Sequence, residues 1–126
     1  MFKIKDKEIH LTRGDICTIA IKLKVRKSAE EVDTYIFKPG DIVTLGVYYK
    51  NGLDINALLL KDVEVEEESD TVYIILSSED TKLGEMSNKV IKYWYEIQLN
   101  HDQTIIGYDD SGPKLLYLYP EGVDSI

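Results

Sequence analysis

The sequence predicts a single all-β domain over residues 1–126, built as an antiparallel sandwich of two sheets. Three observations lead to this fold class. Apolar and polar residues alternate with a period of two in several segments, as in strands that bury one face. Turn-forming residues separate these segments at short intervals. The length, with 44% hydrophobic and 30% charged residues, suits one globular domain. A barrel is the alternative that this pattern leaves open.

In the first half of the chain, residues 2–12 predict a strand with a break at residues 6–7. The clearest alternation follows and places five side chains on one face, namely Cys17, Ile19, Ile21, Leu23 and Val25. The Pro-Gly pair at residues 39–40 predicts a turn before a strand at residues 43–49. The Asn-Gly pair at residues 51–52 is a second turn signal.

The second half continues in the same pattern. Strands are expected over residues 59–65, 71–76, 91–99, 104–108 and 114–119. Residues 77–80 fit a capping box and predict a short turn of helix, because a hydroxyl stands three residues before a carboxylate. Residues 119–126 are expected to form a loose C-terminal tail. The chain thus contains about seven to nine short strands, as sandwiches do.

Strand phase also predicts the core. The residues expected to be buried are Ile19, Ile21, Leu23, Leu45, Val47, Tyr95, Ile97 and Leu99. Cys17 shares the core phase of its strand, where a thiol acts as a small hydrophobic group. As the single cysteine of the chain, it allows neither an intrachain disulfide nor a Cys-rich zinc site.

The composition argues against several partners. The net charge of −8 makes nucleic acid an unlikely partner, because binding a phosphate backbone needs clustered Lys and Arg. An acidic surface also matches anionic lipid poorly. The start of the sequence lacks the apolar core of a secretory signal, and no apolar run is long enough to span a bilayer. We therefore expect synthesis in the cytoplasm and no membrane contact.

No constellation in the sequence supports catalysis. His10 and His101 lie in an alternating strand and a polar turn, without the nucleophile and orienting group that a triad needs. Acidic clusters at residues 64–70 and 109–110 raise a metal site as an alternative, since hard cations bind carboxylates. A charge run at a strand end is more often a solvated edge. The Arg-Gly-Asp tripeptide at residues 13–15 is interpreted as a turn or bulge. We predict no enzyme, no cofactor and no metal site.

Exposed aromatic residues are the candidates for a functional surface. Strand phase places Trp94 opposite the core-facing Tyr93 and Tyr95, among Lys, Glu and Gln. Tyr48 and Tyr73 have similar outward phases in their strands. Exposed aromatics with polar neighbours are typical of interfaces and of carbohydrate platforms. The alternative is that sheet curvature or a loop covers Trp94.

Several of these segments together resemble a known family. They are Ile-His-Leu-Thr-Arg-Gly-Asp at residues 9–15, Pro-Gly-Asp at 39–41, Leu-Ser-Ser-Glu-Asp-Thr at 76–81 and Tyr-Trp-Tyr-Glu-Ile-Gln-Leu at 93–99. The resemblance is to the N-terminal domain of upper baseplate proteins from phages of Gram-positive hosts, and it covers about residues 9–119. It implies an immunoglobulin-like sandwich that attaches a receptor-binding apparatus to the phage tail.

Two functions follow as hypotheses. The first is a non-enzymatic structural adaptor of a phage or prophage tail baseplate, which docks other tail proteins, forms homo-oligomers and ends up in the virion after synthesis in the bacterial cytoplasm. A short adaptor fits better than a presenter of receptor-binding proteins, because the sequence stops soon after residue 122 without a coiled coil. The second is a carbohydrate-binding module that uses Trp94 and nearby tyrosines for stacking.

Overall fold

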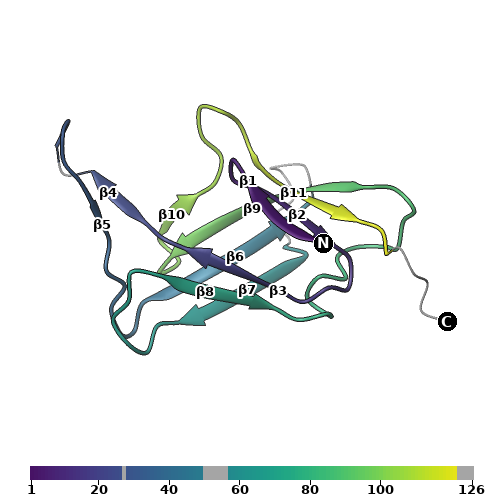
Figure 1. Ribbon diagram of the computed structural model, residues 1–126, viewed down its shortest axis with the longest axis horizontal. Coiled ribbons are helices and arrows are strands. Elements are labelled where there is room, and N and C mark those ends of the chain that lie inside the picture. The colour runs from purple at the N-terminus through teal and green to yellow at the C-terminus, as the bar shows by residue number, and fades with distance from the viewer. Residues whose placement is uncertain (27, 50–56, 122–126) are drawn as a thin grey trace.

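The computed structural model describes residues 1–26, 28–49 and 57–121, and these residues contain strands and no helix (Figure 1). The all-β prediction is confirmed. The eleven strands of the described residues are β1 (Phe2–Lys5), β2 (Glu8–Thr12), β3 (Cys17–Ile21), β4 (Lys24–Arg26), β5 (Val32–Thr34), β6 (Ile42–Tyr48), β7 (Leu59–Glu64), β8 (Val72–Leu76), β9 (Ile91–Leu99), β10 (Gln103–Ile106) and β11 (Lys114–Tyr119).

Seven of these strands form one large sheet in the order β1-β2-β11-β9-β6-β7, with β10 also paired to β9. Strand β11 pairs with the first half of β9, and β10 pairs with its last residues. All neighbours in the sheet are antiparallel except β2 and β11, which run parallel. The prediction of an antiparallel sandwich is wrong at this pair, which joins the second strand to the last strand of the described residues.

A small sheet of β3 and β8 covers the large one (Figure 1). Both of its strands bury every second residue, as Ile19 and Ile74 illustrate. These side chains form one core with Leu45 and Ile97 of the large sheet. Every residue of the predicted core is buried except Leu23, which is half-buried and packs against that core.

The expectation of one continuous strand from Cys17 to Val25 is wrong. Strand β3 ends at Ile21, and the chain then forms the hairpin β4–β5, which Figure 1 shows extending beyond the two sheets. The carbonyl of Leu23 accepts a hydrogen bond from the backbone N–H of Tyr35 at the base of this hairpin. Apolar and polar residues continue to alternate in the sequence after Ile21, although β3 pairs with β8 and β4 pairs with β5.

The turns follow the sequence signals with one exception. Positive φ values at Asp6 and Lys7 make the break between β1 and β2 a tight hairpin turn, and Gly40 takes φ +94° in the Pro-Gly turn. The capping box at residues 77–80 is present as reciprocal hydrogen bonds between Ser77 and Asp80, but it closes a turn and starts no helix. The Asn-Gly signal at residues 51–52 lies outside the described residues.

The C-terminal tail begins later than expected. Tyr119 is the last residue of β11, so it belongs to the large sheet. Its carbonyl accepts a hydrogen bond from the backbone N–H of Arg13. Residues 122–126, which make up most of the predicted tail, lie outside the described residues.

Candidate docking surface

The outward face of the large sheet carries an aromatic surface near its centre. Along β9 the side chains of Tyr93 and Tyr95 are buried, whereas Trp94 lies on the opposite, outward face. The strand register places Trp94 beside Tyr48 of β6 and, on the other side, beside Leu115 of β11. Sheet pairing therefore brings together two of the three predicted interface aromatics, Trp94 and Tyr48.

Tyr108 completes this group, which we call the Trp94 cluster (Tyr48, Trp94 and Tyr108). The Tyr108 ring centre lies 5.9 Å from that of Trp94, with 42° between the planes. Tyr108 is 72% exposed, whereas Trp94 and Tyr48 are half-buried, so a partner can reach only part of their ring surfaces. A hollow of about 60 Å³ lies between these rings and Pro113. That volume has room for about two waters, so it can accept a small side chain but cannot enclose a sugar ring.

Tyr48 lies along the sheet because Gly46, two residues earlier on the same face, has no side chain. A Cβ atom at Gly46 would lie 2.6 Å from the Tyr48 hydroxyl oxygen. That hydroxyl donates a hydrogen bond to Oε1 of Glu96 at 3.4 Å, and Nε2 of Gln98 donates to the same oxygen at 3.0 Å. Burial, and then the charge of Glu96, raise the pKa of Tyr48. These contacts fix the orientation of the ring.

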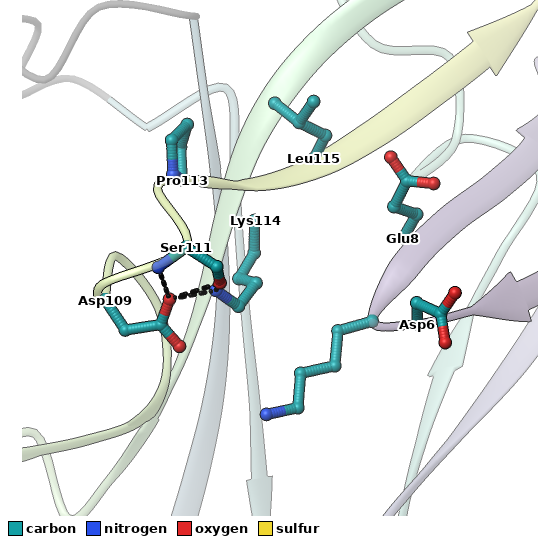
Figure 2. A pocket seen from close by; sticks show the side chains of 8 residues that line it. Asp6, Glu8, Asp109, Ser111, Pro113, Lys114 and Leu115 are labelled. Carbon is teal, nitrogen blue, oxygen red and sulfur yellow. Dashed lines mark hydrogen bonds and ion pairs between the residues drawn. The ribbon is translucent and has the colours of Figure 1, made fainter.

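The loop that carries Tyr108 is held by a buried lysine (Figure 2). Nζ of Lys114 lies 2.7 Å from Oδ1 of Asp109 and 3.3 Å from both Oγ of Ser111 and the carbonyl oxygen of Gly112. The Lys114 side chain is only 9% exposed, so its ammonium group depends on these partners. The hydrogen bond from Lys114, followed by those from Ser111, lowers the pKa of the Asp109 carboxyl. Lys114 is thus the anchor of the loop.

A larger hollow of about 320 Å³ separates this loop from the β1–β2 turn (Figure 2). Its lining combines the carboxylates of Asp6, Glu8 and Asp109 with the ammonium groups of Lys7 and Lys114. Asp109 already binds the Lys114 ammonium. The charges that remain are the carboxylates of Asp6 and Glu8 and the ammonium group of Lys7, so the hollow is a poor match for an anionic ligand.

A second aromatic group, the His10 cluster (His10, Tyr117 and Tyr119), lies on the same face over β2 and β11. The rings of His10 and Tyr117 stack at 4.6 Å with 6° between their planes, and Nδ1 of His10 lies 2.9 Å from the Tyr119 hydroxyl. The Tyr117 hydroxyl donates to Oε2 of Glu8 at 3.0 Å, and Nζ of Lys92 lies 5.7 Å from the Tyr117 ring centre. Together the two clusters extend the aromatic surface across four strands.

Sequence reasoning did not assign Tyr108, nor the His10 cluster, to this surface. A signal was available for Tyr117 and Tyr119, which alternate with the buried Leu116 and Leu118. Their contact with His10 depends on the parallel pairing of β2 with β11. Nothing in the local sequence indicates that pairing.

Tyr73, the third predicted interface residue, lies elsewhere. It is on the outward face of β8 in the small sheet, where it is 58% exposed beside Ile75 and opposite Ala20 of β3. The core lies between the two sheets, so the outward faces point away from each other. The structure therefore does not bring Tyr73 together with Trp94 and Tyr48.

Cys17 and the Arg-Gly-Asp tripeptide, which the sequence raised as candidates for chemistry, both have structural roles. Cys17 is buried in β3, and burial, aided by the charge of Asp15, raises the pKa of its thiol to about 11. In the Arg-Gly-Asp tripeptide, Gly14 has φ +87°, and its N–H donates to Oγ1 of Thr81 at 3.0 Å. The Arg13 side chain is largely buried. The interpretation of this tripeptide as a turn is confirmed.

Comparisons with protein-family models, with curated proteins and with solved structures found no match for the chain. Within residues 1–26, 28–49 and 57–121, no helix is long and apolar enough to cross a membrane. In the same residues, no group of three His, Cys, Asp or Glu side chains is arranged to hold a metal ion.

Proposed function

We propose that this chain is a non-enzymatic docking module that binds another protein through the Trp94 cluster. The observation that carries the proposal is an oriented, partly exposed group of one Trp and two Tyr rings at the centre of a sheet face. Trp and Tyr dominate binding hot spots because they remove much apolar area from water at little entropic cost. Glu96 and Gln98 supply the polar rim that such interfaces have.

The fixed geometry of the cluster supports the same proposal. Tyr48 is held by Glu96, and the Tyr108 loop is held by Lys114 before any partner arrives. A surface that is already ordered loses less side-chain entropy when it binds, so more of the contact energy appears as affinity.

The sequence resemblance supports a place for this module in a phage tail baseplate, with other tail proteins as partners and the virion as its location. Two sheets around one core, with turn-rich connections, are compatible with the immunoglobulin-like sandwich that the resemblance implies. This assignment rests on the motif residues alone.

A carbohydrate-binding module is the second candidate. It is favoured by aromatic rings with carboxylate and amide neighbours, Glu96 and Gln98, on the same face. The hollow beside Trp94 is too small to enclose a sugar, so a saccharide would have to stack on the open side of Tyr108. This makes the protein-docking proposal the stronger one.

The test measures binding of the purified chain to tail proteins encoded beside its gene. Trp94→Ala should weaken binding about thirtyfold, which corresponds to the hot-spot threshold of about 2 kcal/mol. Tyr73→Ala is the matched control, because it removes an exposed aromatic from the other sheet and should change affinity by less than about twofold. Circular dichroism checks that both variants fold.

A parallel titration with soluble cell-wall saccharides separates the two candidates. The docking proposal predicts that Trp94 fluorescence does not respond to the saccharides but responds to the protein partner. A saccharide response that Trp94→Ala abolishes would favour the carbohydrate module. Equal protein binding by wild type and Trp94→Ala would refute the proposed surface.

A further inference from the structure

The large sheet ends in two edge strands, β1 and β7. Among the described residues, β1 pairs only with β2 and β7 pairs only with β6. Each strand therefore has one side on which its backbone groups lack a ladder partner within the described chain. Such an edge can pair with a strand of another molecule.

The two edge strands run in the same direction. Four of the five steps from β1 to β7 across the sheet are antiparallel, and the step from β2 to β11 is parallel. An even number of reversals leaves β1 and β7 parallel to each other. Two copies that share the same outward face can therefore place β1 of one beside β7 of the other, in parallel.

The side chains of these edges carry opposite charges with the same spacing. Lys3 and Lys5 of β1 are exposed, and the register with His10 and Glu8 places them on the outward face. Asp62 and Glu64 of β7 are exposed on the same face of the opposite edge. Each pair is separated by a single residue, as neighbours on one strand face must be.

Apolar residues complete the match. Between the two lysines lies Ile4, which is 46% exposed, and between the two acids lies Val63, which is half-buried. In the register that places Lys3 beside Asp62, Ile4 falls beside Val63 and Met1 falls beside Leu60, which is 64% exposed. Lys3 and Lys5 thus meet opposite charges, and Met1 and Ile4 meet apolar residues, whereas Phe2 falls beside Lys61, which is already ion-paired with Asp80.

We propose that copies of this chain associate head to tail, with β1 of one copy added in parallel to β7 of the next. Charges on an edge strand usually discourage pairing. Here they discourage it only between identical edges, because two β1 edges bring lysines together and two β7 edges bring carboxylates together. The contact uses different surfaces on the two copies, so it repeats and builds a ring or an open filament.

Charge reversal on each edge tests the proposal. Sedimentation velocity over a concentration series at low salt should show association of the wild type that weakens at high salt, because the contact depends on ion pairs. The double variants Lys3→Glu/Lys5→Glu and Asp62→Lys/Glu64→Lys should each remain monomeric. An equimolar mixture of the two should associate again, because both of its mixed contacts pair opposite charges.

Two controls keep the outcome interpretable. Lys22→Glu/Lys89→Glu makes the same change in net charge as Lys3→Glu/Lys5→Glu, at exposed positions away from both edges, and should associate like the wild type. Asp62 accepts a hydrogen bond from Thr44, so if Asp62→Lys/Glu64→Lys unfolds, Lys5→Glu and Glu64→Lys replace the two double variants in the same mixing experiment.

A wild type that stays monomeric at every concentration at low salt overturns the proposal. So does a mixture that fails to associate, or a control that dissociates as fully as the edge variants. Trp94 lies on a central strand and not at an edge, so Trp94→Ala should leave the association unchanged. The association and the proposed docking function can therefore fail separately.

Discussion

Both sheets expose tyrosine on their outward faces, but they hold it in different ways. On the large sheet, the Tyr48 hydroxyl is hydrogen-bonded to Glu96, and Tyr108 lies against Trp94. On the small sheet, Tyr73 is 58% exposed, and its side chain has no hydrogen bond or ring contact within the part of the chain that the structure describes. The first surface is partly exposed and ordered, whereas the second is only exposed.

The difference follows from the number of neighbours. Trp94 is on a strand with partners on both sides and has a loop beside it, so three segments contribute to its surroundings. Tyr73 is on one strand of a two-stranded sheet and has a single neighbouring strand. Exposure can thus be read from strand phase, but order depends on the neighbours that the topology supplies.

The largest test of this difference removes the anchor of the Tyr108 loop. Lys114→Met keeps most of the side-chain volume but loses the bonds to Asp109 and Ser111. We expect a loss of about 1.5 kcal/mol in the free energy of unfolding, near the lower end for hydrogen bonds to charged groups, since Asp109 is half exposed and can be hydrated. Chemical denaturation measures the loss, and faster amide exchange at residues 107–113 should accompany it.

The matched control for that variant is Lys82→Met. Lys82 forms a looser surface ion pair with Glu79, at 3.6 Å. Such pairs contribute about 0–1 kcal/mol, so the unfolding free energy should change less than in Lys114→Met. Equal losses in the two variants would mean that Lys114 is not an anchor.

The next effect concerns the space that Tyr48 occupies. Alanine normally stabilises a strand relative to glycine by about 0.5–1 kcal/mol. At position 46 its Cβ would meet the Tyr48 hydroxyl at 2.6 Å, so we expect Gly46→Ala to destabilise the protein by about 1 kcal/mol. In a Tyr48→Ala background the same change should become neutral or stabilising. A cost that persists without the Tyr48 ring would contradict this account of the glycine.

A double-mutant cycle measures the ring contact itself. Trp94→Ala and Tyr108→Ala should show a coupling of about 0.5–1 kcal/mol in the free energy of unfolding, as aromatic pairs do. The same cycle with Trp94→Ala and Tyr73→Ala should show none, because the two residues lie on opposite outward faces. Equal couplings would remove the distinction between the two surfaces.

The smallest effect is in the pH dependence of stability. The hydrogen bond from Lys114 lowers the pKa of Asp109 in the folded protein. A carboxyl whose pKa is lower in the folded protein than in the unfolded chain stabilises the fold. This stabilisation is complete above the pKa in the unfolded chain, near 4, and it is lost as the pH falls through the pKa in the folded protein. The stability difference between wild type and Asp109→Asn should therefore be constant from about pH 7 to 5 and shrink below about pH 4.

Asp110→Asn is the control for the pH experiment. It removes the negative charge of the residue that follows Asp109, whereas Asp109 itself is the carboxylate that contacts Lys114. Thermal unfolding at each pH provides the measurement. If the difference between wild type and Asp109→Asn does not shrink in acid, Lys114 does not act through the ionised carboxylate.

Much of the fold could be predicted from the sequence because burial has a period of two in these strands. The phase of β9 was sufficient to place Tyr95 and Ile97 inside and Trp94 outside. The same pattern failed after Ile21, because alternation does not reveal a change of pairing partner from β8 to β5. The local sequence of a strand shows which of its side chains are buried, but it does not show which strand pairs with it.

The candidate site was predictable only in part for the same reason. Trp94 and Tyr48 were identified from their own strands, and their contact followed from the pairing of β9 with β6. Tyr108 belongs to the surface because Lys114 holds its loop. The phase of β11 places Lys114 with the buried Leu116 and Leu118, but it does not indicate the ion pair with Asp109. His10 meets Tyr117 only through a pairing between the two ends of the described chain.

The position of β11 has a consequence for how the protein is made. Of the described strands, this one is the last to leave the ribosome, yet it lies in the sheet between β2 and β9. The hairpin of β1 and β2 is synthesised first, but it cannot join β9 until β11 has emerged. Folding of the large sheet must therefore be completed late, with a long-range step of the kind that folds slowly. Until then the edge of β2 stays unprotected in the nascent chain, where a chaperone or another unfinished copy can reach it.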